Sequence, residues 1–341
     1  MTNNSQVLIE SLSIPEKLSY FNENDKNNYE VLAKKFREKK IKHIVTVARG
    51  TSDCAALFVS YVFAKNLGLT TYSLPPSLIT LENATFDFKN TLVILITQSG
   101  LSQDLITCES AVKTMGAETL VITNNFKSGL IYSGTYVYDI NAGEEKSIAA
   151  TKTFVLTLAI ITKLISTILL KKNIFKHLLE LPAHLQKEVN NNWDHEIINQ
   201  NISRGFIISR GIGFALSNEI SLKFKELCQE QIEPYSSAEV MHGPKSLIDN
   251  TFKVFTLSLN DLSGKSVNKD TNKLKQKTNH LYDITSNTQF SDRLLFKKNK
   301  SPELDPLIVM TKFYPWIIKY SLAKGMDPDN PRYLSKVTKT F

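Results

Sequence analysis

The stretch LVILITQSGLSQD, residues 92–104, joins a run of apolar and β-branched side chains to a polar turn that contains a glycine. A continuous apolar run of this length predicts a strand buried on both faces, as in a parallel sheet. Helical periodicity follows from residue 102 to residue 115, and Gly116 is a typical helix end. This order of strand, turn and helix predicts an α/β fold.

Further strands are expected at residues 43–47, 119–123 and 136–140, with a helix over residues 53–67 that ends at Gly68. The second half repeats the order. FIISRG, residues 206–211, is similar to IVTVARG, residues 44–50, and strands at 253–259 and 281–285 match those at 92–97 and 120–123. The sequence therefore predicts two tandem copies of a three-layer αβα unit, each a parallel flavodoxin-like sheet flanked by helices.

The chain of 341 residues is longer than one hydrophobic core usually supports. The patterns place an N-terminal helical segment at residues 1–30 and the first α/β unit at 31–172. A helical connector at 173–200 leads to the second unit at 201–325, and residues 326–341 form a tail.

The composition is that of a soluble globular protein, with 42% hydrophobic and 22% charged residues. The net charge of +8 lies largely in lysine-rich polar stretches without interleaved aromatic residues, so no nucleic-acid partner is expected. Three scattered cysteines form no C-x-x-C pair, which predicts neither disulfides nor a zinc site. The N-terminus lacks a signal-peptide pattern, and residues 154–170 predict a buried helix rather than a membrane span. A cytoplasmic location is expected.

The polar turn at residues 98–102 stands where open α/β sheets bind ligands. The hydroxyls of Thr97, Ser99 and Ser102 are suitable phosphate donors, Gly100 allows a close backbone approach, and a helix N-terminus favours an anion. The alternative is a plain helix cap at Ser102. The turn Gly50-Thr51-Ser52 allows the same two interpretations, with Ser52 or Asp53 as the cap, and the residues alone leave both open.

Several motifs together resemble the sugar-isomerase (SIS) domain family, and in their order they are most similar to the isomerase half of glucosamine-6-phosphate synthase. They are ARGTS (48–52), TQSGLSQD (97–104), AATKTF (149–154), LKFKEL (222–227), AEVMHGP (238–244) and DNPRYLSKVT (329–338). The resemblance implies phosphate binding by Ser52, Thr97, Gln98, Ser99 and Ser102, and sugar binding by Thr51, Ile148 and Ala150. The synthase pattern usually has a serine at the position of Ala150, so one hydrogen bond to the sugar is absent.

The same resemblance implies three catalytic residues. Glu226 matches the acid–base residue that moves a proton between C1 and C2, and the alternative is an exposed Lys223–Glu226 surface pair. His242 matches the histidine that opens the sugar ring, on a loop that reaches a neighbouring subunit, so a homodimer is implied. Lys336 matches the lysine that forms a Schiff base with the open-chain ketose, and the alternative is a solvated tail charge.

The synthase carries an amide-hydrolysing domain with a nucleophilic cysteine, for which this chain has no room before the first unit. We therefore expect a protein like the standalone SIS-type glucosamine-6-phosphate deaminases, converting glucosamine 6-phosphate and water to fructose 6-phosphate and ammonia. No metal or cofactor is expected. Alternatives are a fructosamine-6-phosphate deglycase, an aldose–ketose phosphate isomerase, an ammonia-dependent aminotransferase-like protein and a non-catalytic sugar-phosphate sensor. The sensor is disfavoured because Glu226, His242 and Lys336 occur together and residues 1–42 lack a helix-turn-helix signature.

Overall fold

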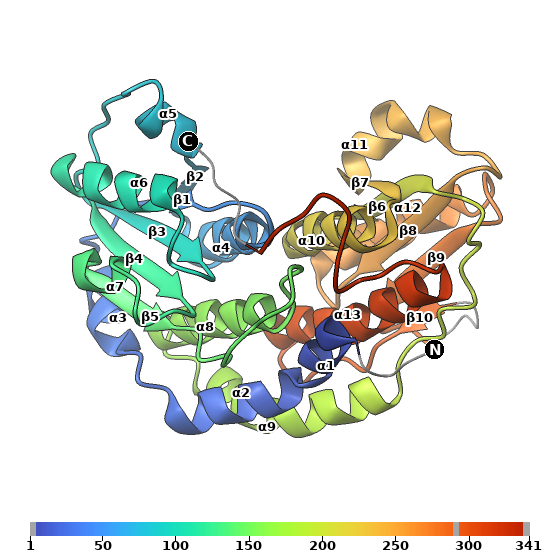
Figure 1. Ribbon diagram of the computed structural model, residues 1–341, viewed down its shortest axis with the longest axis horizontal. Coiled ribbons are helices and arrows are strands. Elements are labelled where there is room, and N and C mark those ends of the chain that lie inside the picture. Colours follow the sequence, from blue (N-terminus) through green and yellow to red (C-terminus); the bar gives the residue numbers. More distant parts are fainter. Residues whose placement is uncertain (1–4, 289–292, 337–341) are drawn as a thin grey trace. The chain divides into compact units, whose positions relative to one another are not determined.

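The computed structural model describes residues 5–288 and 293–336, and its chain divides into two compact units (Figure 1). The first-sheet unit comprises Glu16–Glu145, Lys152–Leu179 and the tail from Ser335. The second-sheet unit comprises the residues up to Pro15, the segment Lys146–Thr151 and Glu180–Leu334. Each unit is thus assembled from several stretches of chain. The domain limits expected from the sequence stay predictions.

The first sheet has the order β2-β1-β3-β4-β5, and all of its strands are parallel. Its strands are β2 (Thr70–Ser73), β1 (His43–Val47), β3 (Thr91–Thr97), β4 (Glu118–Thr123) and β5 (Tyr136–Asp139). Every residue of the central β3 is buried, as its apolar run predicts. The edge strand β2 was not expected, because TTYS is polar and mostly exposed and therefore has no apolar pattern.

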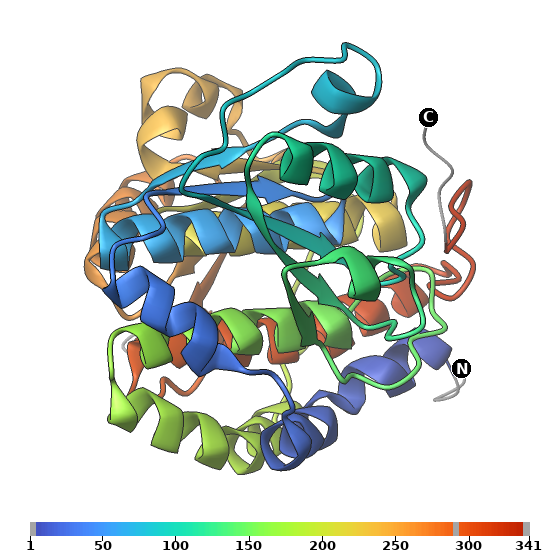
Figure 2. The ribbon, with the colours of Figure 1, turned by 90° about the vertical axis from the view of Figure 1, so that its left-hand side faces the viewer.

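Helices cover both faces of this sheet (Figure 2). On one face α3 (Tyr29–Arg37) and α4 (Thr51–Leu67) pack against α8 (Lys152–Ile168). On the other, α5 (Pro76–Thr80) packs on α6 (Gln103–Thr114), which also contacts α7 (Leu130–Ser133). The nearly continuous burial of α8 confirms the buried helix expected around residues 154–170. In the part of the chain that is described, no helix has the length and apolarity needed to span a membrane.

The second sheet repeats this topology in the order β10-β9-β8-β6-β7, again all parallel. Its strands are β6 (Arg204–Ser209), β7 (Gln231–Ser236), β8 (Lys253–Ser258), β9 (Leu281–Thr285) and β10 (Arg293–Leu295). Counted from the first strand of each unit, both sheets have the order 2-1-3-4-5, the flavodoxin-like arrangement. The structure therefore confirms the predicted fold of two parallel α/β units.

The helices of the second unit also repeat those of the first. On one face α13 (Asp305–Ala323) packs on α10 (Ile212–Cys228) and on the N-terminal α1 (Gln6–Leu12). On the other lie α12 (Leu262–Leu274) and α11 (Ser237–His242), and α11 is followed by the short helix η1 (Pro244–Leu247). A second short helix, η2 (Pro302–Leu304), precedes α13. Helix α2 (Ile14–Asn24) follows α1 in the chain, and from Glu16 on it belongs to the first-sheet unit.

The predicted connector is helical only in its first part, because α9 spans Lys172–Asn190 and an irregular segment follows. Asp194 and Asn199 stabilise turns in the irregular segment. Their side-chain oxygens accept hydrogen bonds from the backbone N–H two residues later, each at 2.9 Å. Such local bonds compete with helix formation.

Two local features show how closely the units repeat. Gly50 and Gly211 precede α4 and α10 with nearly the same backbone angles, φ 58° and 62° with ψ −132° and −136°, a region open essentially to glycine. After β4 and β9, the hydroxyls of Thr123 and Thr285 each accept a hydrogen bond from the N–H two residues on, at 3.2 Å.

Candidate active site

The turns after β1 and β3 lie next to each other at the carboxyl edge of the first sheet. The two strands pair in parallel, with Val47 opposite Leu95. The chain leaves β1 towards α4 and leaves β3 towards α6, which lie on opposite faces of the sheet. This is a topological switch point, where α/β proteins bind their ligands.

A set of hydrogen bonds fixes the turn after β3. Gly100 N donates to Thr97 Oγ1 at 3.1 Å, and Asn125 Nδ2 donates to the carbonyl of Ser99 at 2.7 Å. Gly100 has φ 63°, and a Cβ at this position would lie 2.4 Å from Ser128 Oγ. The turn therefore requires glycine, and its backbone is positioned before any ligand arrives.

The plain-cap interpretations of the two turns do not describe this structure. Ser102 occupies the N-cap position of α6 but makes no side-chain capping bond to that helix. At α4 the N-cap residue is Gly50, so neither Ser52 nor Asp53 is the cap. Helix capping by Ser102, Ser52 or Asp53 is therefore not seen, while Ser99 Oγ accepts a hydrogen bond from Leu101 N at 3.2 Å. Phosphate binding at these turns stays a prediction.

An ion pair that the sequence reasoning missed connects the two turns. Arg49 Nε lies 2.5 Å from Asp104 Oδ2, and the Asp104 side chain is 1% exposed whereas that of Arg49 is 45% exposed. The buried carboxylate orients a partly exposed guanidinium beside the switch point. The sequence feature that could have indicated this ion pair is the presence of a basic residue, Arg49, and an acidic residue, Asp104, in two turns expected at the same edge of the sheet.

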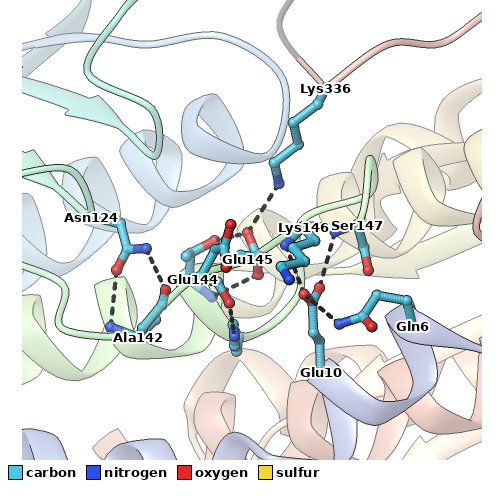
Figure 3. Close-up of polar contacts among 12 residues, drawn as sticks. Gln6, Glu10, Asn124, Ala142, Glu144, Glu145, Lys146, Ser147 and Lys336 are labelled. Carbon is cyan, nitrogen blue, oxygen red and sulfur yellow. Dashed lines mark hydrogen bonds and ion pairs between the residues drawn. The ribbon is translucent and has the colours of Figure 1, made fainter.

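Lys336 contacts a buried carboxylate of the first-sheet unit (Figure 3). Its Nζ lies 3.6 Å from Glu145 Oε2, and the Glu145 side chain is fully buried. Glu145 also accepts hydrogen bonds from Thr153 N and Thr153 Oγ1, at 3.2 and 2.8 Å. Lys336 is thus an ion-pair partner and not a solvated tail charge. Val337 and Thr338 of the same motif lie outside the described residues.

The loop that contains Ile148 and Ala150 is anchored by α1 within the second-sheet unit. The carboxylate of Glu10 accepts from Lys146 N at 2.7 Å and from Ser147 N at 3.3 Å (Figure 3). Ile148 and Ala150 follow, and both are half-buried. Sequence reasoning did not identify Glu10, since a glutamate in a short N-terminal helix carries no local signal of this contact.

The aspartate of the DNPR motif holds the other end of α1. Asp329 accepts hydrogen bonds from Gln6 N and Val7 N at 2.9 and 2.8 Å, and from Ser5 Oγ at 3.0 Å. A carboxylate at this position satisfies backbone donors of the first helical turn. The tail motif therefore has a structural contact that the resemblance alone did not assign.

Glu226 belongs to a buried charge cluster on α10. Lys223 Nζ lies 2.6 Å from Glu226 Oε2 and 3.3 Å from Glu219 Oε1, and Glu219 also accepts from the hydroxyl of Tyr314 at 2.9 Å. Lys223 and Glu219 are fully buried, whereas the Glu226 side chain is 21% exposed. The alternative of an exposed Lys–Glu surface pair is therefore wrong.

The predicted site residues fall into two sets. Thr51, Ser52, Thr97, Gln98, Ser99, Ser102 and Lys336 belong to the first-sheet unit, and Ile148, Ala150, Glu226 and His242 belong to the second-sheet unit. His242 is exposed at the end of α11, directly before Gly243. The convergence of both sets on one ligand stays a prediction, as does the sharing of the His242 loop in a dimer. Over the described residues, no cluster of histidine, cysteine or carboxylate side chains is suited to a metal ion.

Residues 36–167, which carry the first sheet, match the model of the SIS domain family. Residues 36–167 form a SIS domain. The two turns at the switch point, Gly100 and the Arg49–Asp104 pair all lie inside this SIS domain. SIS domains bind sugar phosphates.

Comparisons over the whole chain extend this result. The chain is 28% identical over 307 residues to the glutamine–fructose-6-phosphate aminotransferase (isomerizing) of Sulfolobus acidocaldarius, covering 86% of the chain and 49% of that protein. The chain spans about half the length of the curated relatives it matches. A solved structure from Silicibacter pomeroyi, described as a "putative phosphosugar isomerase", is 28% identical with a TM-score of 0.85, covering 95% of this chain and all of that one. Glucosamine-6-phosphate deaminase of Thermotoga maritima shares the fold, with 20% identity, a TM-score of 0.74 and coverage of 98% and 100%.

Proposed function

We propose that this protein is a phosphosugar isomerase-type enzyme that deaminates glucosamine 6-phosphate, with water as co-substrate and fructose 6-phosphate and ammonia as products. The observation that carries the proposal is the cluster of Lys223, Glu219 and Glu226. A fully buried lysine between two carboxylates is costly to maintain. Its position beside the partly exposed Glu226 supports a carboxylate held in place for proton transfer, which a protein that only binds a sugar phosphate does not need.

The phosphate end of the substrate is assigned to the SIS domain. Thr97, Gln98, Ser99 and Ser102 surround the N-terminus of α6, and Ser52 lies in the first turn of α4 at the neighbouring switch-point turn. Backbone N–H groups at a helix N-terminus favour an anion, and hydroxyl donors add directed hydrogen bonds. Arg49, oriented by Asp104, adds guanidinium N–H donors at the same edge, which supports phosphate oxygens as the ligand.

The reaction proceeds by proton transfers on the open-chain sugar. His242 moves the proton that opens the ring, and Glu226 removes the C2 proton and delivers it to C1. With a second proton passing from the amine nitrogen to the C1 oxygen, the product is the C2 imine of the ketose. Addition of water to the imine carbon and loss of the nitrogen gives fructose 6-phosphate and ammonia. Lys336 assists when its amine displaces the C2 nitrogen as ammonia and forms a Schiff base at C2, which water then hydrolyses to fructose 6-phosphate and free lysine. For this step the amine has to leave Glu145 and lose a proton.

The test is an ammonia-release assay on the purified chain with a panel of phosphorylated sugars. The panel contains glucosamine 6-phosphate, a fructosamine 6-phosphate and, for the reverse direction, fructose 6-phosphate with ammonia. Ammonia and fructose 6-phosphate from the first substrate are the expected result. Turnover of the fructosamine alone would identify a deglycase instead, and binding of all substrates without turnover would identify a sensor.

Glu226→Gln gives the matched test of the proton-transfer step. The amide keeps the shape and a hydrogen bond to Lys223 but cannot accept the C2 proton, so exchange of the C2 proton with solvent deuterium should fall by roughly 10²- to 10⁴-fold. Affinity for the sugar phosphate, measured by calorimetry, should stay within a few-fold of the wild type. Loss of binding in this variant would assign Glu226 a structural role.

A further inference from the structure

The second sheet has a cavity of about 720 Å³ at its carboxyl edge, within the size range of small-molecule sites. It is lined by the ends of β8 and β9 and by the start of α12. Lys298, which follows β10, also contributes to the lining. None of the residues assigned to the proposed reaction lines it, so it is separate from that machinery.

The cavity corresponds by internal repeat to the phosphate turn of the SIS domain. β3 and β4 end in the paired hydroxyl residues Thr97 and Thr123, and β8 and β9 end in the paired residues Ser258 and Thr285. In both units a helix begins within a few residues of the central strand. The second unit therefore places two hydroxyls and a helix N-terminus where the first unit has its anion turn.

The hydroxyls of Thr97 and Ser258, at the ends of β3 and β8, differ in their hydrogen bonds. Thr97 Oγ1 accepts the N–H of Gly100 and so holds its own turn. Ser258 is 2% exposed, and among the described residues its Oγ has no hydrogen-bond partner. A buried hydroxyl without a partner is unfavourable, so its partner is expected to be a molecule that enters the cavity.

Charge and polarity identify the kind of molecule. Lys265 in the first turn of α12 and Lys298 bring two positive charges to the lining. The one acidic lining residue, Asp261, already accepts the N–H of Gly264 at 2.8 Å as the cap of α12. Much of the remaining lining consists of amides and hydroxyls, among them Asn260, Asn268 and Asn287.

We propose that this cavity is a second ligand site, for a small polyhydroxylated phosphate monoester. Lys265, Lys298 and the hydroxyl of Ser258 hold its phosphate, and the asparagine amides pair with its hydroxyl groups. The site lies wholly within the second-sheet unit and is described without reference to Glu226, His242 or Lys336. The proposal of a second ligand site therefore does not depend on whether the chain deaminates glucosamine 6-phosphate.

Calorimetric titration of the full chain at low salt tests the proposal, with glucose 6-phosphate and inorganic phosphate as probes. The background is Ser99→Ala with Ser102→Ala, which weakens binding at the SIS-domain turn so that the remaining binding reports the second site. In that background the double variant Lys265→Gln/Lys298→Gln should bind glucose 6-phosphate at least about tenfold more weakly, because charge-assisted hydrogen bonds are lost. Ser258→Ala should weaken it several-fold.

Lys269→Gln is the matched control, because Lys269 is an exposed lysine one turn further along α12 and does not line the cavity. It should leave the affinity unchanged. The proposal is wrong if the background chain binds neither probe, or if Lys269→Gln weakens binding as much as the lysine pair. Failure of the deaminase assay would leave this comparison untouched, which keeps the two proposals distinguishable.

Discussion

Lys223 lies at the centre of a buried charge cluster on α10. It lies on α10 within 3.3 Å of one carboxylate four residues earlier and within 2.6 Å of another three residues later. The earlier carboxylate, Glu219, is as deeply buried as the lysine, whereas Glu226 reaches partly into solvent. The pair Lys223–Glu219 therefore acts as a buried support that orients Glu226.

Replacing Lys223 tests this support. Lys223→Met should lower the free energy of unfolding by about 3–5 kcal/mol, because it leaves a buried carboxylate without its cation. Urea unfolding measures the loss. Lys225→Met on the same helix removes only an exposed pair with Glu233 and should cost about 0–1 kcal/mol. Equal effects of the two substitutions would mean that the cluster contributes no more than a surface ion pair.

At the scale of elements, α1 connects two motifs that are far apart in sequence. Asp329 of the tail contacts its first turn, and Glu10 near its end holds the backbone of residues 146 and 147. This short helix therefore links Asp329 to the loop that contains Ile148 and Ala150, so a shift of Asp329 should also move the loop.

Asp329→Ala should cost about 1 kcal/mol of stability through the lost cap and should raise KM for the sugar phosphate, because the loop loses its support. Steady-state kinetics together with thermal unfolding separate the two effects. Asp329→Asn retains a hydrogen-bond acceptor, so its stability and its KM should both lie close to those of the wild type. An unchanged KM in Asp329→Ala would show that α1 does not position the loop.

The N-terminus of α13 carries a buried aspartate with a pH-dependent effect on stability. Burial raises the pKa of Asp305 to about 7, although the N–H of Asn299 donates to it and opposes the shift. A carboxyl whose pKa is higher in the folded state stabilises the fold when protonated, and this contribution is lost as the pH rises from about 4 to 7. Asp305→Asn should therefore be more stable than the wild type at pH 8, by roughly 1–4 kcal/mol, and the gain at pH 5 should be about a third as large. Urea unfolding at both pH values measures this, and a gain of the same size at both would contradict the assigned titration.

At the scale of the whole molecule, the central strands and the repeat could be predicted because each is marked by a pattern within a short stretch of sequence. The apolar run of β3 predicts a buried strand, and Gly50 and Gly100 predict turns, because both effects depend on only a few neighbouring residues. Edge strands such as β2 and β7 (QIEPYS) lack that pattern, because their side chains are mostly exposed or polar. Partners such as Glu10 and Glu145 could not be predicted, since each meets its partner only after segments distant in sequence have packed together.

The last prediction concerns the oligomer that the resemblance implies. Glu226→Gln and His242→Asn should each be inactive alone. If the His242 loop acts in the active site of a partner subunit, a mixed dimer of the two variants rebuilds one intact site from two damaged chains. Refolding or co-expressing equal amounts should then restore about a quarter of the wild-type activity, because half of the dimers are mixed and each has one functional site. Sedimentation analysis establishes that dimers have formed. Dimers without any recovered activity would mean that His242 serves its own chain, and the proposed sharing would be wrong.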